Sequence, residues 1–296
     1  MRLLVINLPF NPYIIDFGWL ALSWHGLFTA LGLMTALYLV VRWSKAYSNH
    51  LNKQGQSGIN LTADTVLQVA PWAILSGIIG ARLFHVIDFW SAIYVYNPIS
   101  VLYIWKGGIA IYGAVLGGFL GGFLYLRLRN SEKALKIIGY IPMIKKPMAI
   151  RLPKPGVLAD LVAAPMILGM AIGRIGDVIN GEHFASYTDL PWGVIYTHPF
   201  SPGSSRPASH PAVFYELLWD MMIFGLLLWL RGRMKPNGMV FVMFILLYSF
   251  GRFFIMFLRD DYYMNIFGFN QAQVVALILV LITLPLVCFR ARFIKN

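Results

Sequence analysis

The chain has 296 residues, of which 58% are hydrophobic and 12% are charged. Soluble proteins contain roughly 45–50% apolar and about 25% charged residues, so this composition excludes an ordinary soluble globular protein. The formal net charge of +12 does not indicate nucleic-acid binding. Its lysines and arginines lie between apolar stretches, whereas a phosphate-binding surface gathers them on one solvated face.

Seven mostly apolar stretches each approach the length of about 20 residues that a helix needs to cross a bilayer core of about 30 Å. In chain order they are expected at residues 18–41, 65–87, 107–127, 156–173, 210–230, 238–258 and 271–289. The sequence therefore predicts an all-α, polytopic integral membrane protein. We expect one seven-helix transmembrane domain over 1–296, an external loop at about 174–209 and a basic cytoplasmic loop at about 128–155.

The basic residues predict the orientation of the helices, because lysine and arginine in short loops are retained on the cytoplasmic side. Most of the 24 follow the odd-numbered spans: Arg42, Lys45, Lys53, Arg127, Arg129, Lys133, Lys136, Lys145, Lys146, Arg151, Lys154, Arg231, Arg233, Lys235, Arg290, Arg292 and Lys295. The others are Arg2, Lys106 and five arginines at or near the opposite side. We therefore expect an external N-terminus and a cytoplasmic C-terminus.

Several ionisable residues fall inside the predicted spans, where they are costly and usually mark a substrate path. They lie within about 10 Å of the outer ends of their helices, at a rise of 1.5 Å per residue. They are His25, Arg82, His85, Arg174, Asp177 and Arg252. Polar groups from several helices at one depth indicate a site near the outer leaflet.

An anionic phospholipid head group fits this arrangement, because arginine keeps its charge and pairs bidentately with phosphate. The segment GRIGDVINGE supports that interpretation. Its glycines, Gly173, Gly176 and Gly181, are expected to let the backbone turn sharply toward a ligand. Its polar contacts would come from Arg174, Asp177, Asn180 and Glu182.

Structural explanations compete at single positions. Arg82 and Arg259 could instead extend their side chains to the membrane interface. His25 could be a packing residue, and Tyr112 could be an ordinary aromatic residue of the membrane interface. Cys288, the only cysteine, is expected to be a buried structural thiol. The spacing of His198, His210 and Glu216 matches no defined metal motif, and we expect neither a metal nor a cofactor.

The motifs resemble the bacterial prolipoprotein diacylglyceryl transferases over most of the chain. The resemblance runs through LSWHG, GARLFHVIDFW, KGGIAIYGAVLGG, GRIGDVINGEHF, HPAVFYE and GRFFIMFLRDD, and GRIGDVINGE is its most specific part. It implies a multi-pass enzyme of the bacterial inner membrane with its active site toward the outer leaflet. Its partners would be membrane lipids, phosphatidylglycerol and the lipobox peptide of a preprolipoprotein, whose cysteine thiol receives the diacylglyceryl group as glycerol phosphate leaves.

The resemblance also implies roles for single residues. Arg174 looks like the family's phospholipid-binding arginine and Arg252 like its second essential arginine, while Asn180 and Glu182 belong to the signature. The family often has Tyr at the position of His25 and His at that of Tyr112, so a His and Tyr pair across one cavity is a hypothesis. The expected catalytic residues are His25, Tyr112, Arg174 and Arg252; those expected to bind substrate are Arg174, Asp177, Asn180, Glu182, Arg82 and Arg259.

The chain departs from the family pattern at three positions. Asp177 stands where Asn is frequent, Ala185 where Gly is frequent, and Met256 where Glu often follows the arginine by one turn. The last change removes an expected partner of Arg252. These departures leave open a relative with a different acceptor or head group, and a non-enzymatic lipid or anion transporter is the alternative from another class.

A substrate thiol with a pKa near 8.5 needs a base, and a histidine with a pKa near 6.5 is able to accept its proton. We nominate His25 for this role. The competing histidines are His85, His183, His198 and His210.

Overall fold

A computed structural model describes residues 5–18, 21–53, 61–104, 107–139, 152–260 and 265–294. Several basic residues that predict the orientation lie outside these ranges, namely Arg2, Lys106, Lys145, Lys146, Arg151 and Lys295.

Within the described ranges, seven helices are long and apolar enough to cross a membrane. They are α1 (Trp24–Lys53), α2 (Ala63–Asp88), α3 (Ile111–Arg129), α5 (Pro155–Asn180), α6 (Ala212–Leu230), α7 (Met239–Ile255, continued by the short helix η4, Met256–Leu258) and α8 (Gln271–Arg290). The predicted all-α membrane fold is confirmed. Shorter helices lie between them: η1 (Trp90–Tyr94), η2 (Pro98–Leu102) and α4 (Glu132–Gly139).

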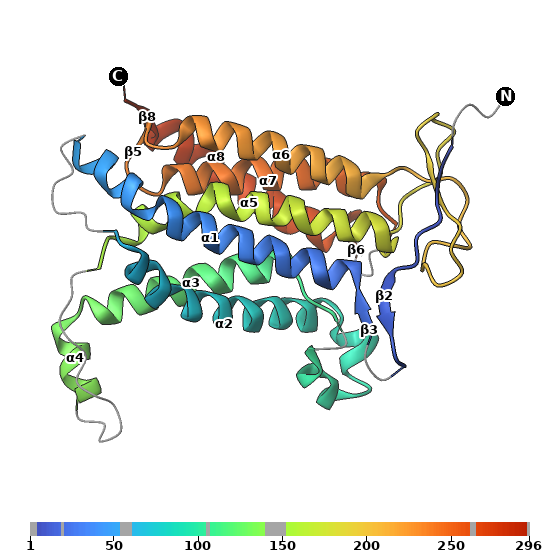
Figure 1. Ribbon diagram of the computed structural model, residues 1–296, viewed down its shortest axis with the longest axis horizontal. Coiled ribbons are helices and arrows are strands. Elements are labelled where there is room, and N and C mark those ends of the chain that lie inside the picture. Colours follow the sequence, from blue (N-terminus) through green and yellow to red (C-terminus); the bar gives the residue numbers. More distant parts are fainter. Residues whose placement is uncertain are drawn as a thin grey trace. The chain divides into compact units, whose positions relative to one another are not determined.

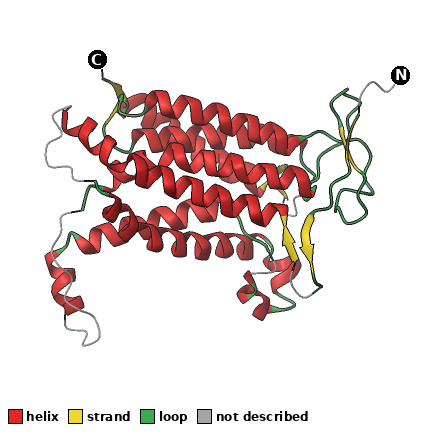
Figure 2. Ribbon diagram, viewed as in Figure 1, coloured by secondary structure: helices red, strands yellow, loops and turns green. Residues whose placement is uncertain are grey.

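The bounds of α1 differ from the prediction at both ends. The helix begins at Trp24 because Ala21–Ser23 form strand β3, which pairs antiparallel with β2 (Tyr13–Asp16) beside the start of the helix (Figure 2). It continues to Lys53, so Arg42 and Lys45 are helical rather than in a loop. Thirty residues span about 45 Å, which is longer than a hydrocarbon core of about 30 Å.

The end of α5 also differs, and it changes the interpretation of the glycine-rich segment. The helix runs to Asn180, seven residues beyond the predicted end at 173. Gly173 and Gly176 are therefore helical, and the prediction that they turn the backbone is wrong. Gly181 does turn it, with a φ of +70° that a side chain would strain. The segment after α5 consequently begins at Gly181, and Arg174, Asp177 and Asn180 are fixed by helical geometry.

The chain forms two compact units, Met1–Leu39 with Val162–Asn296, and Val40–Leu161. In the second unit α2 and α3 lie side by side (Figure 1). Glycines allow this contact, since a Cβ at Gly80 would lie 2.4 Å from the carbonyl oxygen of Gly113, and one at Gly117 would lie 2.3 Å from that of Ser76. Small residues are a usual means of close helix packing in membranes.

In the first unit α6, α7 and α8 pack along their lengths (Figure 1). Ile223, Leu227 and Phe244 are at most 1% exposed and form the centre of the packing. Gly251 allows α7 to approach Trp219, whose indole Nε1 donates to the carbonyl of Leu247 at 3.0 Å.

Short strands join the ends of this unit. Strand β1 (Ile6–Leu8) pairs parallel with β4 (Val194–Tyr196). Two further pairs are antiparallel, β5 (Met234–Lys235) with β8 (Arg292–Phe293) and β6 (Asn265–Ile266) with β7 (Phe269–Asn270). Cys288 on α8 is exposed, so the prediction of a buried thiol is wrong. The hydropathy of a span does not reveal which of its faces turns outward.

Candidate functional site

A close contact between α1 and α5 brings His25 to Asp177. A Cβ at Gly176 would lie 2.7 Å from the Cα of His25 and from the carbonyl oxygen of Trp24, so only glycine permits this approach. The Nδ1 of His25 is hydrogen-bonded to Oδ1 of Asp177. Asp177 is 5% exposed and His25 is 35% exposed, so a buried carboxylate orients an accessible imidazole.

Arg174 joins this pair to helix α6. Its Nη1 donates to Oδ2 of Asp177 at 2.9 Å, and its Nη2 lies 2.8 Å from Oε2 of Glu216. Arg174 and Asp177 are three residues apart on α5 and therefore share a helix face. The guanidinium fork thus fixes two carboxylates from two helices at once.

Glu216 is the centre of a larger cluster. Besides Arg174, it accepts a hydrogen bond from Nη1 of Arg252 on α7 and one of 3.2 Å from Nη1 of Arg259, which follows η4. Glu216 and Arg259 are each 4% exposed, and Arg174 and Arg252 are 12% exposed. Arg252, whose expected partner at position 256 is replaced by methionine, pairs with Glu216.

His183 lies between Arg259 and Asp177. Nη2 of Arg259 donates to Nδ1 of His183 at 2.8 Å, and Nε2 of His183 lies 3.6 Å from Oδ2 of Asp177. Because arginine has only donors, Nδ1 of this histidine is the acceptor and its proton is on Nε2. Both ring nitrogens of His183 therefore face charged residues of the cluster, Nδ1 facing Arg259 and Nε2 facing Asp177.

Backbone pairing holds Arg259 in place. Ala185 forms a bridge with Arg259, and the amides of Ser186 and Asp260 donate to the carbonyls of Leu258 and Phe184 at 2.9 and 3.1 Å. The segment after α5 is thus fastened to the end of η4. Alanine is accommodated at 185, where the family often has glycine.

Asn180 and Glu182 lie at the end of α5, beside the start of α1. Oδ1 of Asn180 accepts from the backbone amide of His25 at 3.4 Å, and its Nδ2 donates to Glu182 at 2.5 Å. Asn180 is 1% exposed and Glu182 is exposed. Asn180 consequently links the first turn of α1 to Glu182. Asn180 and Glu182 both lie close to His25.

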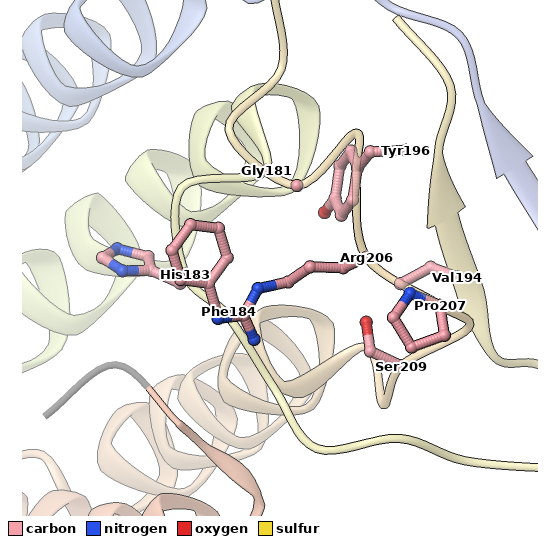
Figure 3. A pocket seen from close by; sticks show the side chains of 9 residues that line it. Gly181, His183, Phe184, Val194, Tyr196, Arg206, Pro207 and Ser209 are labelled. Carbon is pink, nitrogen blue, oxygen red and sulfur yellow. The ribbon is translucent and has the colours of Figure 1, made fainter.

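A pocket in the segment after α5 is lined by His183, which also belongs to the cluster, and by Gly181 (Figure 3). On its far side Arg206 stacks 4.0 Å from the ring centre of Phe184. The hydroxyl of Tyr196 donates to the carbonyl of Val178 at 3.0 Å, and burial raises the pKa of Tyr196 to about 12. Tyr196 therefore stays neutral and fastens the segment to α5.

Arg82 and Tyr112 belong to the second unit. Arg82 is 7% exposed and donates to backbone carbonyls through all three nitrogens. Its Nε donates to Val101 at 2.9 Å, its Nη1 to Gly107 and Gly108 at 2.7 and 2.8 Å, and its Nη2 to Ser100 at 2.5 Å. These contacts support a structural role in the connection between α2 and α3. Its role in lipid binding stays a prediction, as does the role of Tyr112, which lies half-buried in the first turn of α3.

Replacing Arg82 with methionine is expected to loosen the α2–α3 connection while leaving the helices intact. A buried carbonyl that loses its donor lowers the free energy of unfolding by about 1–3 kcal/mol. Hydrogen–deuterium exchange should accelerate over residues 97–104 in R82M. The matched control is R127M, since Arg127 is exposed in the last turn of α3. Unchanged exchange in R82M would contradict the structural role.

Two acidic residues of the site were missed by sequence reasoning. Glu216 was considered only as a metal ligand, and Asp220 was not considered. Both lie in the fifth predicted span, four residues apart, and both are at most 4% exposed. Two acids on one face of an apolar helix are the signal that would have identified them. The arginine partners of Glu216 come from α5, from α7 and from the residue after η4, so the pairing itself required the fold.

Comparisons of the sequence with known proteins identify its family. The sequence matches the family described as Prolipoprotein diacylglyceryl transferase over residues 12–151 and 143–289. It is 32% identical over 285 residues to the phosphatidylglycerol–prolipoprotein diacylglyceryl transferase of Dehalococcoides mccartyi, covering 95% of this chain and 94% of the relative. The enzyme of the same name from Clostridioides difficile is 33% identical over 257 residues, or 87% of this chain and 86% of the relative.

A third enzyme of this name, from Trichormus variabilis, is 32% identical over 280 residues, which cover 90% of this chain and 85% of the relative. The residues matched by the family, 12–289, contain the positions of the arginine and carboxylate cluster. The chain belongs to the prolipoprotein diacylglyceryl transferase family.

Proposed function

We propose that this chain transfers the diacylglyceryl group of phosphatidylglycerol to the cysteine thiol of a prolipoprotein lipobox. Family membership supports the reaction, and the observation that carries it is the convergence of three arginines on Glu216. Three buried guanidinium groups at one depth form a binding site for an anionic head group.

The reaction breaks one carbon–oxygen bond and forms one carbon–sulfur bond. The thiolate sulfur attacks the carbon of the diacylglycerol unit that is bonded to a phosphate oxygen. The bonding electron pair leaves with the phosphate oxygen, and glycerol phosphate is released. The thiol proton passes to a base, and the peptide retains the diacylglyceryl group as a thioether.

The leaving phosphate gains negative charge, which fixed arginines stabilise strongly in a site with little water. Arg174 and Arg252 are the proposed catalytic arginines, and Arg259 joins them in binding the head group. Nε of Arg252 is a buried donor for which the described residues supply no acceptor. The phosphate oxygens would accept from it and share the donors that Glu216 now holds.

His25 is the proposed base. An ionised Asp177 is only an acceptor, so the proton of the His25 ring lies on Nδ1 and Nε2 is left to accept the thiol proton. His183 is a weaker candidate, because Arg259 donates to its Nδ1 and its Nε2 faces Asp177. Asn180 and Glu182 are proposed to position His25 and the glycerol hydroxyls, respectively.

The depth of the charges favours this enzyme over the transporter alternative. In α5 no charged residue lies between Asp160 and Arg174, α6 has none after Asp220, and α7 has none before Arg252. A transport path would be expected to carry polar groups along the whole depth. We place the enzyme in the bacterial plasma membrane with this site toward the outer leaflet, where the peptide arrives.

The direct test combines purified protein, phosphatidylglycerol and a synthetic lipobox peptide, with mass spectrometry of the peptide. The expected product is the peptide with one diacylglyceryl group on its cysteine. A peptide with serine in place of that cysteine is the control and should gain no mass. Folded protein that gives no product with either peptide would contradict the proposal.

Replacement of His25 by phenylalanine is expected to lower the rate more at pH 7 than at pH 9. At the higher pH the substrate thiol, with an ordinary pKa near 8.5, ionises without a protein base. The measurement is the transfer rate of H25F relative to wild type at both pH values. An equal loss at both would remove His25 from the role of base, and H183F is the matched variant for the competing histidine.

A further inference from the structure

Asp220 is an acidic residue of the site for which the proposed chemistry has no use. It lies on α6 one turn after Glu216 and is 1% exposed. Its Oδ2 has no hydrogen-bond partner among the described residues. Arg174 on α5, Arg252 on α7 and Glu216 on its own helix act on it electrostatically, and Tyr248 on α7 is the other titratable group close by.

The three buried carboxylates of the site differ in how well their negative charge is supported. Glu216 contacts three arginines directly. Asp177 contacts Arg174 and His25. Asp220 has no ion pair with any described residue and interacts with the arginines only from a distance. Of the three carboxylates, Asp220 therefore loses the smallest amount of favourable electrostatic interaction when it becomes neutral.

The charges of the cluster balance before any substrate binds. Arg174, Arg252 and Arg259 supply three positive charges. Asp177, Glu216 and Asp220 supply three negative charges when all are ionised, while Glu182 is exposed to solvent. A phosphodiester brings one further negative charge into this site. An uncompensated charge is costly in a medium of low dielectric constant, so binding favours neutralisation of one carboxylate.

We propose that Asp220 takes up one proton from solvent when the phosphodiester of phosphatidylglycerol binds among the three arginines. The carboxylate becomes a neutral carboxyl group, and its negative charge no longer competes with that of the phosphate for the arginines. His25 and His183 are the other groups of the site that are able to bind a proton. This inference rests on the proposed function, because it takes phosphatidylglycerol as the ligand.

The test is calorimetry of phosphatidylglycerol binding to the purified protein in buffers of different ionisation enthalpy. The dependence of the heat on the buffer gives the number of protons taken up. We expect uptake in the wild type and its loss in D220N, whose side chain is already neutral and of the same size. D189N is the matched control, because Asp189 is exposed and lies in the segment after α5. Zwitterionic phosphatidylcholine, which adds no net charge, should cause no uptake.

Kinetics give a second readout. If binding takes up one proton, the KM for phosphatidylglycerol rises by up to about tenfold for each unit of pH increase. This holds over the pH range in which Asp220 is ionised in the free protein. In D220N this dependence should flatten, with kcat retained. D220E should keep both the proton uptake and the slope.

The outcomes separate this inference from the proposed function. Absence of phosphatidylglycerol binding and of transfer would overturn the function, and the inference with it. Binding without proton uptake, or uptake that persists in D220N, would overturn the role of Asp220 alone. If D220N does not fold, infrared difference spectra of the wild type decide, because a new protonated-carboxyl band must appear when the lipid binds.

Discussion

Replacement of Arg174 by alanine is expected to reduce transfer by at least about 100- to 1,000-fold, the loss seen when one donor to a developing anion is removed. The side chain is the proposed phosphate ligand, and it also bridges Asp177 and Glu216 at 2.9 and 2.8 Å. Its loss would therefore free the carboxylate that orients His25. The measurement is the rate of lipobox peptide modification with phosphatidylglycerol.

Two variants sharpen this test. R174K retains the charge but lacks the planar fork that spans two carboxylates, so its rate should lie between those of wild type and R174A. R42A is the control, since Arg42 is exposed on α1, and its rate should equal that of wild type. Helix content and membrane insertion establish that R174A is folded. Normal transfer by folded R174A would refute the assignment of the phosphate ligand.

The second large effect is expected from Glu216→Gln, and it concerns stability. Glutamine keeps the volume of the side chain but leaves Arg174, Arg252 and Arg259 without the carboxylate that they share. Removal of one partner from a buried ion pair costs about 3–5 kcal/mol. We expect a loss of this size in the free energy of unfolding, measured by denaturant titration in mixed micelles.

The control for this variant is again an exposed acid. D189N should change the free energy of unfolding by no more than about 0.5 kcal/mol, as is usual for surface positions. An effect of E216Q no larger than that of D189N would show that the arginines find other counter-charges. In that case Glu216 would not be the centre of the cluster.

The arrangement of the membrane helices follows closely from the sequence, because length and hydropathy alone decide whether a helix spans a bilayer. Sequence patterns failed where tertiary contacts decide a boundary. The start of α1 depends on the pairing of Ala21–Ser23 with β2, and the end of α5 on a helix that continues through two glycines. Neither effect is visible in a hydropathy pattern.

The site was predicted in part. Arg174, Asp177, Asn180 and His25 were expected to be functional, and the structure brings them together at the contact between α1 and α5. The role of Gly176 was misjudged, since a glycine that turns a chain and one that admits a neighbouring helix look the same in sequence. Glu216 was missed as the partner of the arginines because residues 174, 216, 252 and 259 become neighbours only in the fold.

The exposed thiol on α8 has a practical consequence. Cys288 is the only cysteine of the chain and lies two residues before the end of α8 at Arg290, remote in sequence from every residue of the proposed site. Because Cys288 lies in the last turn of a membrane-spanning helix, its reaction with a membrane-impermeant maleimide tests on which side of the membrane that end of α8 lies, without prior mutagenesis. With the orientation expected from the basic residues, inverted membrane vesicles should react with the reagent and intact cells should not, so one labelling experiment distinguishes the two possible orientations of the enzyme.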